Sequence, residues 1–184
     1  MYGAGFGGGA IMHPTAATSQ CAALSAQNRH NDRSYCGPGT HMHVVNGGCH
    51  CGRIEFSAEL SQAPDSYSPR ACDCDFCQKH GATYISDPSG RLRITLASES
   101  DVRRYRQGSG AAEFLICGTC GVLVCVLYRD DQVTYGAINA RAANDPTPFR
   151  QAKPVSPKTL SSVDKVKRWQ EVWFANVGVS TRSV

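Results

Sequence analysis

Hydrophobic and polar residues alternate along much of the chain with the period of two that is typical of β-strands. The clearest alternation covers residues 53–58 and 91–96, where every second residue is apolar. Further segments favour strands at residues 83–86, 102–106, 112–116, 122–128 and 132–135. Asp130 and Asp131 separate the last two of these segments and favour a hairpin turn. The pattern predicts a mainly β fold.

One segment, residues 162–175, has a helical period instead. Its apolar positions are Val163, Val166, Trp169 and Trp173. Asp164 lies near its start, where a negative charge favours a helix, and prolines between residues 146 and 157 mark an irregular linker before it. We therefore expect a short C-terminal helix whose tryptophans pack on the sheet. The alternative is that they form an exposed contact surface.

The first 41 residues differ in composition from the rest, because they are rich in Gly, Ala and Ser. Such a segment buries too little apolar area to offset its chain entropy, so we expect a disordered tail, with Met42 as an alternative start. Cys21 and Cys36 lie in it without a closely spaced partner and are expected to be free thiols. The glycines of residues 3–9 lack the Lys-Ser/Thr ending of a phosphate loop.

The bulk composition is that of a soluble protein with one compact domain and tails, at 184 residues, 41% hydrophobic and 18% charged. No apolar run approaches the roughly 18 residues of a membrane span, and the N-terminus lacks the pattern of a secretory signal. We therefore expect a cytoplasmic location, where thiols stay reduced. Clustered cysteines in that setting indicate a metal site or catalysis rather than disulfides.

Seven of the ten cysteines stand in three tight groups. These are Cys49 and Cys51, then Cys72, Cys74 and Cys77, then Cys117 and Cys120. Four thiolates complete a tetrahedral zinc site, whereas three leave one position open. Combining the first group with the last makes a closed, structural site that joins an early strand to a late one. The middle group would then hold a second zinc that can still accept water or a substrate sulfur. Disulfide pairing is the weaker alternative, because seven is odd.

The residues around the middle group leave some alternatives open. His80, three residues after the last of its sulfurs, has a spacing that allows it to close the shell. His50 projects between two ligands and is expected to face outward. Asp73 and Asp75 flank the sulfurs and are expected to be solvated, although either could move a proton from a bound thiol. Cys125 lies in an apolar run and is expected to be buried in the core.

The three motifs together resemble a known family. Gly-Gly-Cys-His-Cys-Gly, Cys-x-Cys-x-x-Cys-x-x-x-Gly and Cys-x-x-Cys-Gly, in this order between about Val44 and Asn139, are similar to the glutathione-dependent formaldehyde-activating enzymes, which share their domain with centromere protein V. The resemblance implies the Mss4-like fold, in which zinc stitches folded β-sheets together. It implies a structural zinc on Cys49, Cys51, Cys117 and Cys120, and a catalytic zinc on Cys72, Cys74 and Cys77.

The resemblance also implies an activity, S-(hydroxymethyl)glutathione synthesis, which is classed among the carbon–sulfur lyases. The expected partner is a small, glutathione-like thiol, and an anionic thiol needs a nearby cation such as Arg70, Lys79 or Arg91. On this interpretation residues 42–150 are the zinc-binding catalytic domain, and residues 151–184 are a Pro-rich linker with a helical segment.

Two other function classes compete with this one. The Mss4-like fold also serves non-catalytic protein binding, with both zinc ions structural. Nucleic-acid binding is disfavoured by the charge: the formal +4 falls to about +1 when seven thiolates bind two Zn²⁺.

Overall fold

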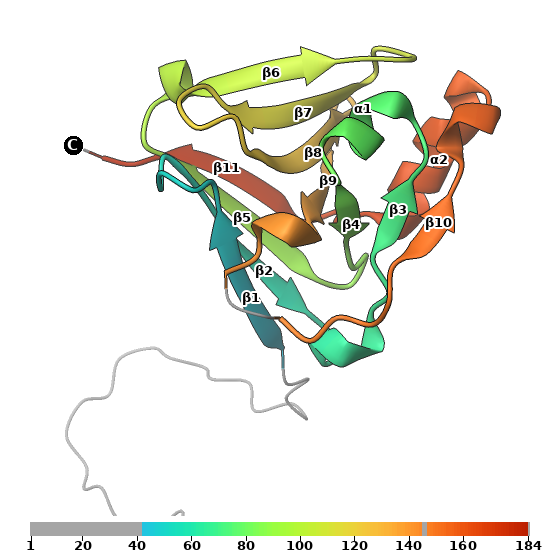
Figure 1. Ribbon diagram of the computed structural model, residues 1–184, viewed down its shortest axis with the longest axis horizontal. Helices are drawn as coiled ribbons and strands as arrows, with labels where there is room; N and C mark the ends of the chain where they lie inside the picture. Colours follow the sequence, from blue (N-terminus) through green and yellow to red (C-terminus); the bar gives the residue numbers. More distant parts are fainter. Residues whose placement is uncertain (1–41, 145–146, 184) are drawn as a thin grey trace, which may run out of the picture. The chain divides into compact units, whose positions relative to one another are not determined.

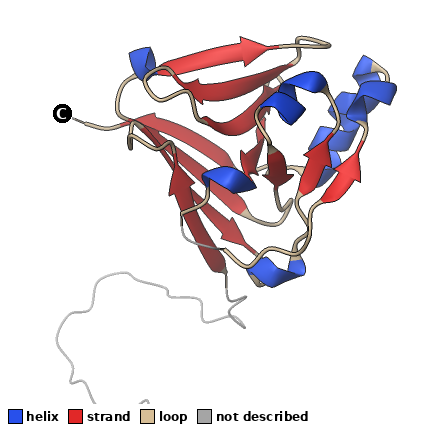
Figure 2. Cartoon of the chain, viewed as in Figure 1, coloured by secondary structure: helices blue, strands red, loops and turns tan. Residues whose placement is uncertain are grey.

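The computed structural model describes residues 42–144 and 147–183 (Figure 1). In this part of the chain, eleven strands form two sheets and helices are few (Figure 2), which confirms the mainly β prediction. The same residues include no helix long and apolar enough to cross a membrane. The expectations for residues 1–41, including Cys21 and Cys36, lie outside the described residues.

The smaller sheet has four strands in the order β1-β2-β5-β11. Their bounds are β1 His43–Gly48, β2 Ile54–Leu60, β5 Arg91–Leu96 and β11 Val177–Thr181. The first three pair antiparallel, and β11 joins β5 in parallel. The last strand, β11, therefore lies in the same sheet as the first strand, β1.

The larger sheet has seven strands in the order β10-β3-β4-β9-β8-β7-β6. Their bounds are β3 Arg70–Cys72, β4 Thr83–Ile85, β6 Val102–Arg106, β7 Ala112–Cys117, β8 Leu123–Arg129, β9 Thr134–Asn139 and β10 Lys153–Val155. All neighbours are antiparallel except β10 and β3. Strands β4 to β8 correspond closely to the segments expected from the alternating pattern. Strand β9 overlaps the strand expected at residues 132–135 only at Thr134 and Tyr135, because the turn that begins at Asp130 extends to Val133, whose carbonyl oxygen accepts a hydrogen bond from the Asp130 N–H.

The alternating segments bury one face each, as their sequences indicate. Ile54, Phe56 and Ala58 of β2 are buried, and so are Leu92 and Ile94 of β5. Strands β1, β3, β10 and β11 were not predicted, because they carry glycine, cysteine or proline in place of a clear alternation.

Strand β8 is buried on both faces of the larger sheet. Val124, Cys125 and Leu127 join the core that the two sheets share. Leu123 and Val126 instead join a smaller apolar core that contains Cys77, Tyr84 and Trp173. Burial on both sides explains the unbroken apolar run of β8. Cys125 has no exposed surface, as expected for a core residue.

Helix α2 (Ser162–Val172) follows the proline-rich segment. Ser161 caps its start, since the hydroxyl accepts a hydrogen bond of 3.1 Å from the backbone N–H of Asp164. The helix ends earlier than predicted, because the backbone of Phe174 exchanges two hydrogen bonds with Gly136 of β9. Phe174 is fully buried, so its packing in the core fixes the point where the helix stops.

Candidate functional site

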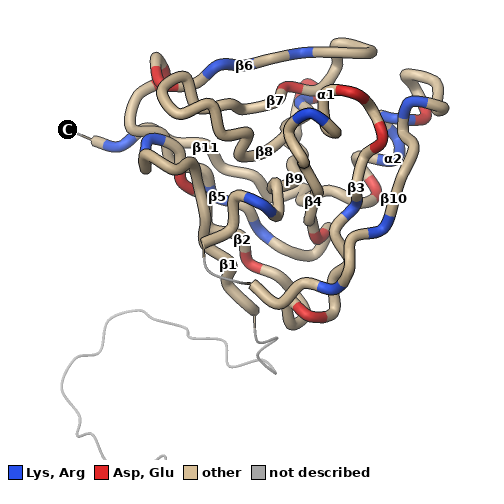
Figure 3. The backbone as a smooth tube through the Cα atoms, viewed as in Figure 1, with Lys and Arg blue, Asp and Glu red and all other residues tan. Residues whose placement is uncertain are grey.

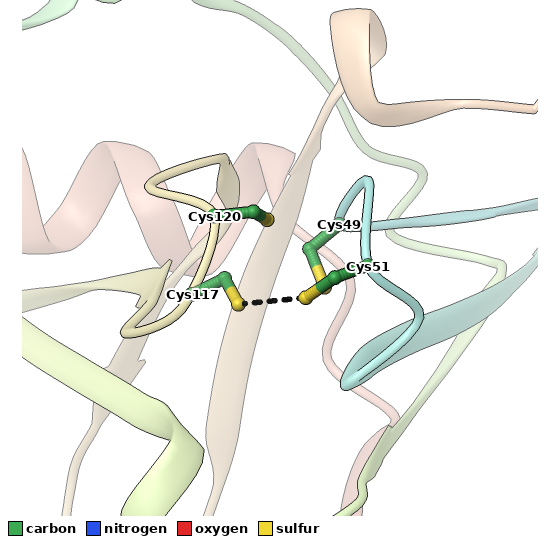
Figure 4. Close-up of side chains that lie close together, drawn as sticks. All are labelled: Cys49, Cys51, Cys117 and Cys120. Carbon is green, nitrogen blue, oxygen red and sulfur yellow. Dashed lines mark hydrogen bonds between the residues drawn. The ribbon is translucent and has the colours of Figure 1, made fainter.

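The first cysteine cluster joins the two sheets. Cys49 and Cys51 lie in the loop after β1, Cys117 is the last residue of β7, and Cys120 lies in the loop between β7 and β8 (Figure 4). The Sγ atoms of Cys51 and Cys117 are 3.5 Å apart, and those of Cys49 and Cys51 are 3.7 Å apart. All four sulfurs lie within 4.8 Å of one another. The structure thus brings together the four residues that the sequence analysis paired.

Both loops of this cluster are built in the same way. Each has a glycine with a left-handed backbone just after its last cysteine, Gly52 at φ +73° and Gly121 at φ +74°. The backbone N–H of Ile54 donates to Cys49 Sγ over 3.2 Å, and Gly121 N–H donates to the carbonyl oxygen of Cys117 over 2.9 Å. The turns therefore hold the sulfurs in place through the backbone, and N–H donors favour the thiolate form.

The geometry of the first cluster fits a tetrahedral metal ion. Four sulfurs at about 2.3 Å from one zinc lie roughly 3.8 Å from one another, which is close to the separations observed here. A disulfide would need an S–S distance of about 2.05 Å, and all eight cysteines of the described residues have free thiols. Four soft sulfur donors suit zinc and leave no position for another ligand.

The second cluster comes from one short stretch at the junction of β3 and α1 (Asp75–Lys79). Cys72 is the last residue of β3, Cys74 is the N-cap of α1, and Cys77 is a buried residue of that helix. Their three sulfurs lie within 4.8 Å of one another, so this group too could hold a metal ion. Its donor set has one ligand fewer than the first.

Two polar side chains contact the sulfurs of this cluster. The Tyr84 hydroxyl lies 3.3 Å from Cys77 Sγ, and Gln107 Nε2 lies 3.7 Å from Cys74 Sγ. Burial raises the pKa of Tyr84, so its phenol stays protonated. A hydrogen bond from Cys77 lowers the pKa of Cys72 to about 6, and the same hydrogen bond, together with burial, raises the pKa of Cys77. The protein groups alone therefore favour one thiolate in the cluster, on Cys72, hydrogen-bonded by the protonated Cys77.

His80 does not join the second cluster in the described structure. Its ring packs on Phe76, with the two centroids 4.5 Å apart, and the residue is exposed. The group of metal-binding side chains found around Cys72 among the described residues contains cysteines alone. His50 is exposed, as expected.

The two aspartates beside the sulfurs differ. Asp75 is exposed, in agreement with the expectation of a solvated carboxylate. Asp73 instead accepts a hydrogen bond of 2.8 Å from the Ser156 hydroxyl and pairs with Lys158 Nζ at 3.1 Å. These contacts tie the β3–α1 junction to the segment after β10, which borders the same site.

A pocket of about 150 Å³ opens over the second cluster, and the three cysteines form part of its wall. Its apolar wall includes Tyr84, Phe114, Trp169 and Trp173. Its basic residues are Arg70, Lys158, Lys165 and Arg168, and no Asp or Glu of the described residues lines it. In Figure 3, basic positions mark both β3 and α2, two elements that contribute to this pocket.

Of the three cations that the sequence suggested for an anionic thiol, only Arg70 lines the pocket. Lys79 lies on α1 outside it, and Arg91 pairs with Glu59 at 3.4 Å. Burial, together with the positive charge of Arg168, lowers the pKa of Arg70 to about 10, which leaves the guanidinium charged at neutral pH. Lys158, Lys165 and Arg168 also line the pocket and were not among the expected cations. Lys165 and Arg168 have a signal in the sequence, because their spacing of three places them on one face of α2.

Comparison with known proteins places this site in context. A family model described as glutathione-dependent formaldehyde-activating enzyme matches residues 44–157, which include both cysteine clusters. A crystal structure of a Rhodobacter sphaeroides protein from a structural genomics programme is similar at 27% sequence identity, with a TM-score of 0.45. The match covers 56% of this chain and 91% of that one.

Proposed function

The chain belongs to the glutathione-dependent formaldehyde-activating enzyme family, and from this membership we propose that it joins a small thiol to formaldehyde or a similar electrophile. The proposed enzyme is zinc-dependent and of the carbon–sulfur lyase type, close to an S-(hydroxymethyl)glutathione synthase. Free thiols throughout the described residues suit a reducing compartment such as the cytoplasm.

The observation that carries the proposal is the different surroundings of the two clusters. Cys72, Cys74 and Cys77 line the pocket, whereas none of the four cysteines of the first cluster does. We assign a structural zinc to Cys49, Cys51, Cys117 and Cys120, and a catalytic zinc to the three pocket cysteines. A bound zinc with an open position supplies charge stabilisation for a substrate thiolate at neutral pH.

The protein groups around the pocket have separate tasks in this reaction. Cys72, Cys74 and Cys77 would hold the ion, and Tyr84 and Gln107 contact two of these sulfurs and would orient them. The apolar wall excludes water from the reacting sulfur. The reaction itself forms a bond from the thiol sulfur to the carbonyl carbon and transfers the thiol proton to the carbonyl oxygen. It needs neither an oxidant nor a leaving group.

The alternative of a non-catalytic protein-binding module with two structural zinc ions has less support. It needs a fourth protein ligand at the second cluster, and His80 packs on Phe76 instead. It also makes Trp169 and Trp173 a contact surface, and both line the pocket.

Formation of the adduct can be followed by NMR with glutathione and formaldehyde. The wild type should accelerate adduct formation above the spontaneous rate, and Cys74→Ser should lose this acceleration while remaining folded. Cys125→Ala, which changes a cysteine outside both clusters, serves as the matched control and should retain it. If the wild type does not exceed the spontaneous rate, the proposed synthase activity is wrong.

A further inference from the structure

Helix α2 lies outside the residues that match the family model, which end at 157, and yet it forms one wall of the pocket. Its four lining residues are Lys165, Arg168, Trp169 and Val172. Residues with these spacings of three, four and seven lie on the same face of a helix. This wall is therefore supplied by residues beyond the part of the chain that matches the family model.

The charges on this wall have no acidic counterpart. Among the described residues, no carboxylate forms an ion pair with Arg70, Lys165 or Arg168. Arg70 donates a hydrogen bond of 2.6 Å to Ser86, a neutral group, and Arg168 is close enough to lower its pKa. Like charges gathered beside a pocket repel one another, and an anion bound among them relieves that repulsion.

The aromatic part of the wall consists of stacked rings. The rings of Trp169 and Trp173 stack with centroids 5.0 Å apart and an interplanar angle of 19°. Tyr128 packs against Trp169 at 5.5 Å, which supports the stack from the sheet side. Such a surface suits the apolar and peptide portions of an extended ligand.

We propose that α2 is the specificity element for the tail of the thiol substrate: Lys165 and Arg168, together with Arg70, bind its carboxylates, and Trp169 packs against the rest of it. This assignment rests on the proposed function of the neighbouring cysteines. It extends that function by assigning the recognition of the substrate's negative charge to a segment outside the matched family domain. It also predicts that small, neutral thiols bind weakly.

The two tryptophans of the chain both line the pocket, so their fluorescence reports directly on binding there. S-methylglutathione serves as the probe, because it carries the two carboxylates and has no thiol to react. Titration of the zinc-loaded protein should change the fluorescence. The dimethyl ester of the same probe should bind about tenfold more weakly or worse, as expected for the loss of charge-assisted hydrogen bonds.

Matched variants on one helix test the role of the residues. Lys165→Gln and Arg168→Gln should each weaken binding of the diacid by about tenfold and leave the ester nearly unaffected. Lys167→Gln is the control, since Lys167 is exposed and does not line this pocket. Zinc content and melting temperature should be unchanged in all three variants.

Equal affinity of the wild type for the diacid and the ester would overturn the proposal, and so would equal binding by the variants and the control. A diacid titration that leaves fluorescence and calorimetric heat unchanged would overturn it as well. These outcomes are separate from the adduct experiment. A protein that binds the diacid through α2 but does not accelerate adduct formation would retain the binding site and lose the proposed reaction.

Discussion

Replacing Cys117 by serine should weaken the binding of the structural zinc and loosen the joint between the two sheets. Cys117 is 1% exposed and is the last residue of β7. Its Sγ atom lies 3.5 Å from the Sγ atom of Cys51, on the other side of the cluster. Serine is a poor ligand for a soft, sulfur-rich site, so the substitution leaves three sulfurs around the ion. The hydroxyl is also buried in an apolar setting, which adds to the cost.

The size of the effect follows from the share of the metal in folding. Structural zinc contributes about 10–16 kcal/mol in small zinc-binding peptides, so an equal share for each of four ligands is about 3 kcal/mol. For a domain of roughly 140 residues, the entropy of unfolding near the melting temperature is about 0.3 kcal/mol/K. We therefore expect the melting temperature of Cys117→Ser to fall by about 10 °C.

Differential scanning calorimetry and a zinc count test this expectation together. Cys125→Ala is the control: Cys125 is also buried but lies outside both clusters, so it should keep both zinc ions and lose only about 1 kcal/mol. Cys117→Ser with both zinc ions and an unchanged melting temperature would refute the four-sulfur assignment. A variant that stayed fully stable and lost activity would mean that the two clusters have the opposite roles.

Three further predictions concern single residues. Burial alone would raise the pKa of Asp87, but hydrogen bonds, led by that of Tyr67, lower it below its ordinary value. The stabilisation is therefore complete above the unfolded pKa of about 3.9 and is lost as the pH falls through the lower folded value. The melting temperature of Asp87→Asn should therefore decrease less than that of the wild type when the pH is lowered from about 5 to about 2. An equal decrease in the two proteins would contradict this role of Asp87. Tyr84→Phe removes the hydroxyl beside Cys77 and should weaken zinc at the pocket cluster about tenfold in a chelator competition, without a change at the first cluster. Gly47→Ala places a Cβ against a backbone carbonyl oxygen, so it should cost about 2 kcal/mol in urea unfolding, and a neutral result would show that β1 can move.

The strands with a clear alternating pattern and the first cluster could be predicted because their signals are local. Alternation in residues 91–96 predicts a strand with one buried face, and β5 has these bounds. The doublets Cys49/Cys51 and Cys117/Cys120 carry the spacing of metal ligands, so their meeting required only that two loops face each other. Local chemistry was sufficient in both cases.

The pocket could not be predicted in the same way, because it depends on long-range placement. Lys165 and Arg168 look like the solvated face of an amphipathic helix until the position of α2 against the second cluster is known. The end of α2 also depends on a distant residue, since Gly136 pairs with Phe174 and stops the helix. Strand β11 is missed for a similar reason: its pairing with β5 is set by topology and not by a strong pattern of its own.

The contrast between the two clusters comes from how the chain delivers its sulfurs. In the first, two loops from different sheets approach from opposite sides, so the four donors surround the space between them (Figure 4). In the second, one six-residue stretch supplies all three sulfurs, and the pocket beside them is bounded by α2. Because one short segment supplies all three sulfurs, the side of the cluster that faces the pocket remains accessible to a ligand. The pocket on that side is basic and partly aromatic. This contrast supports the roles that we propose, in which the same residue type serves folding where it joins two sheets and chemistry where it faces a cavity.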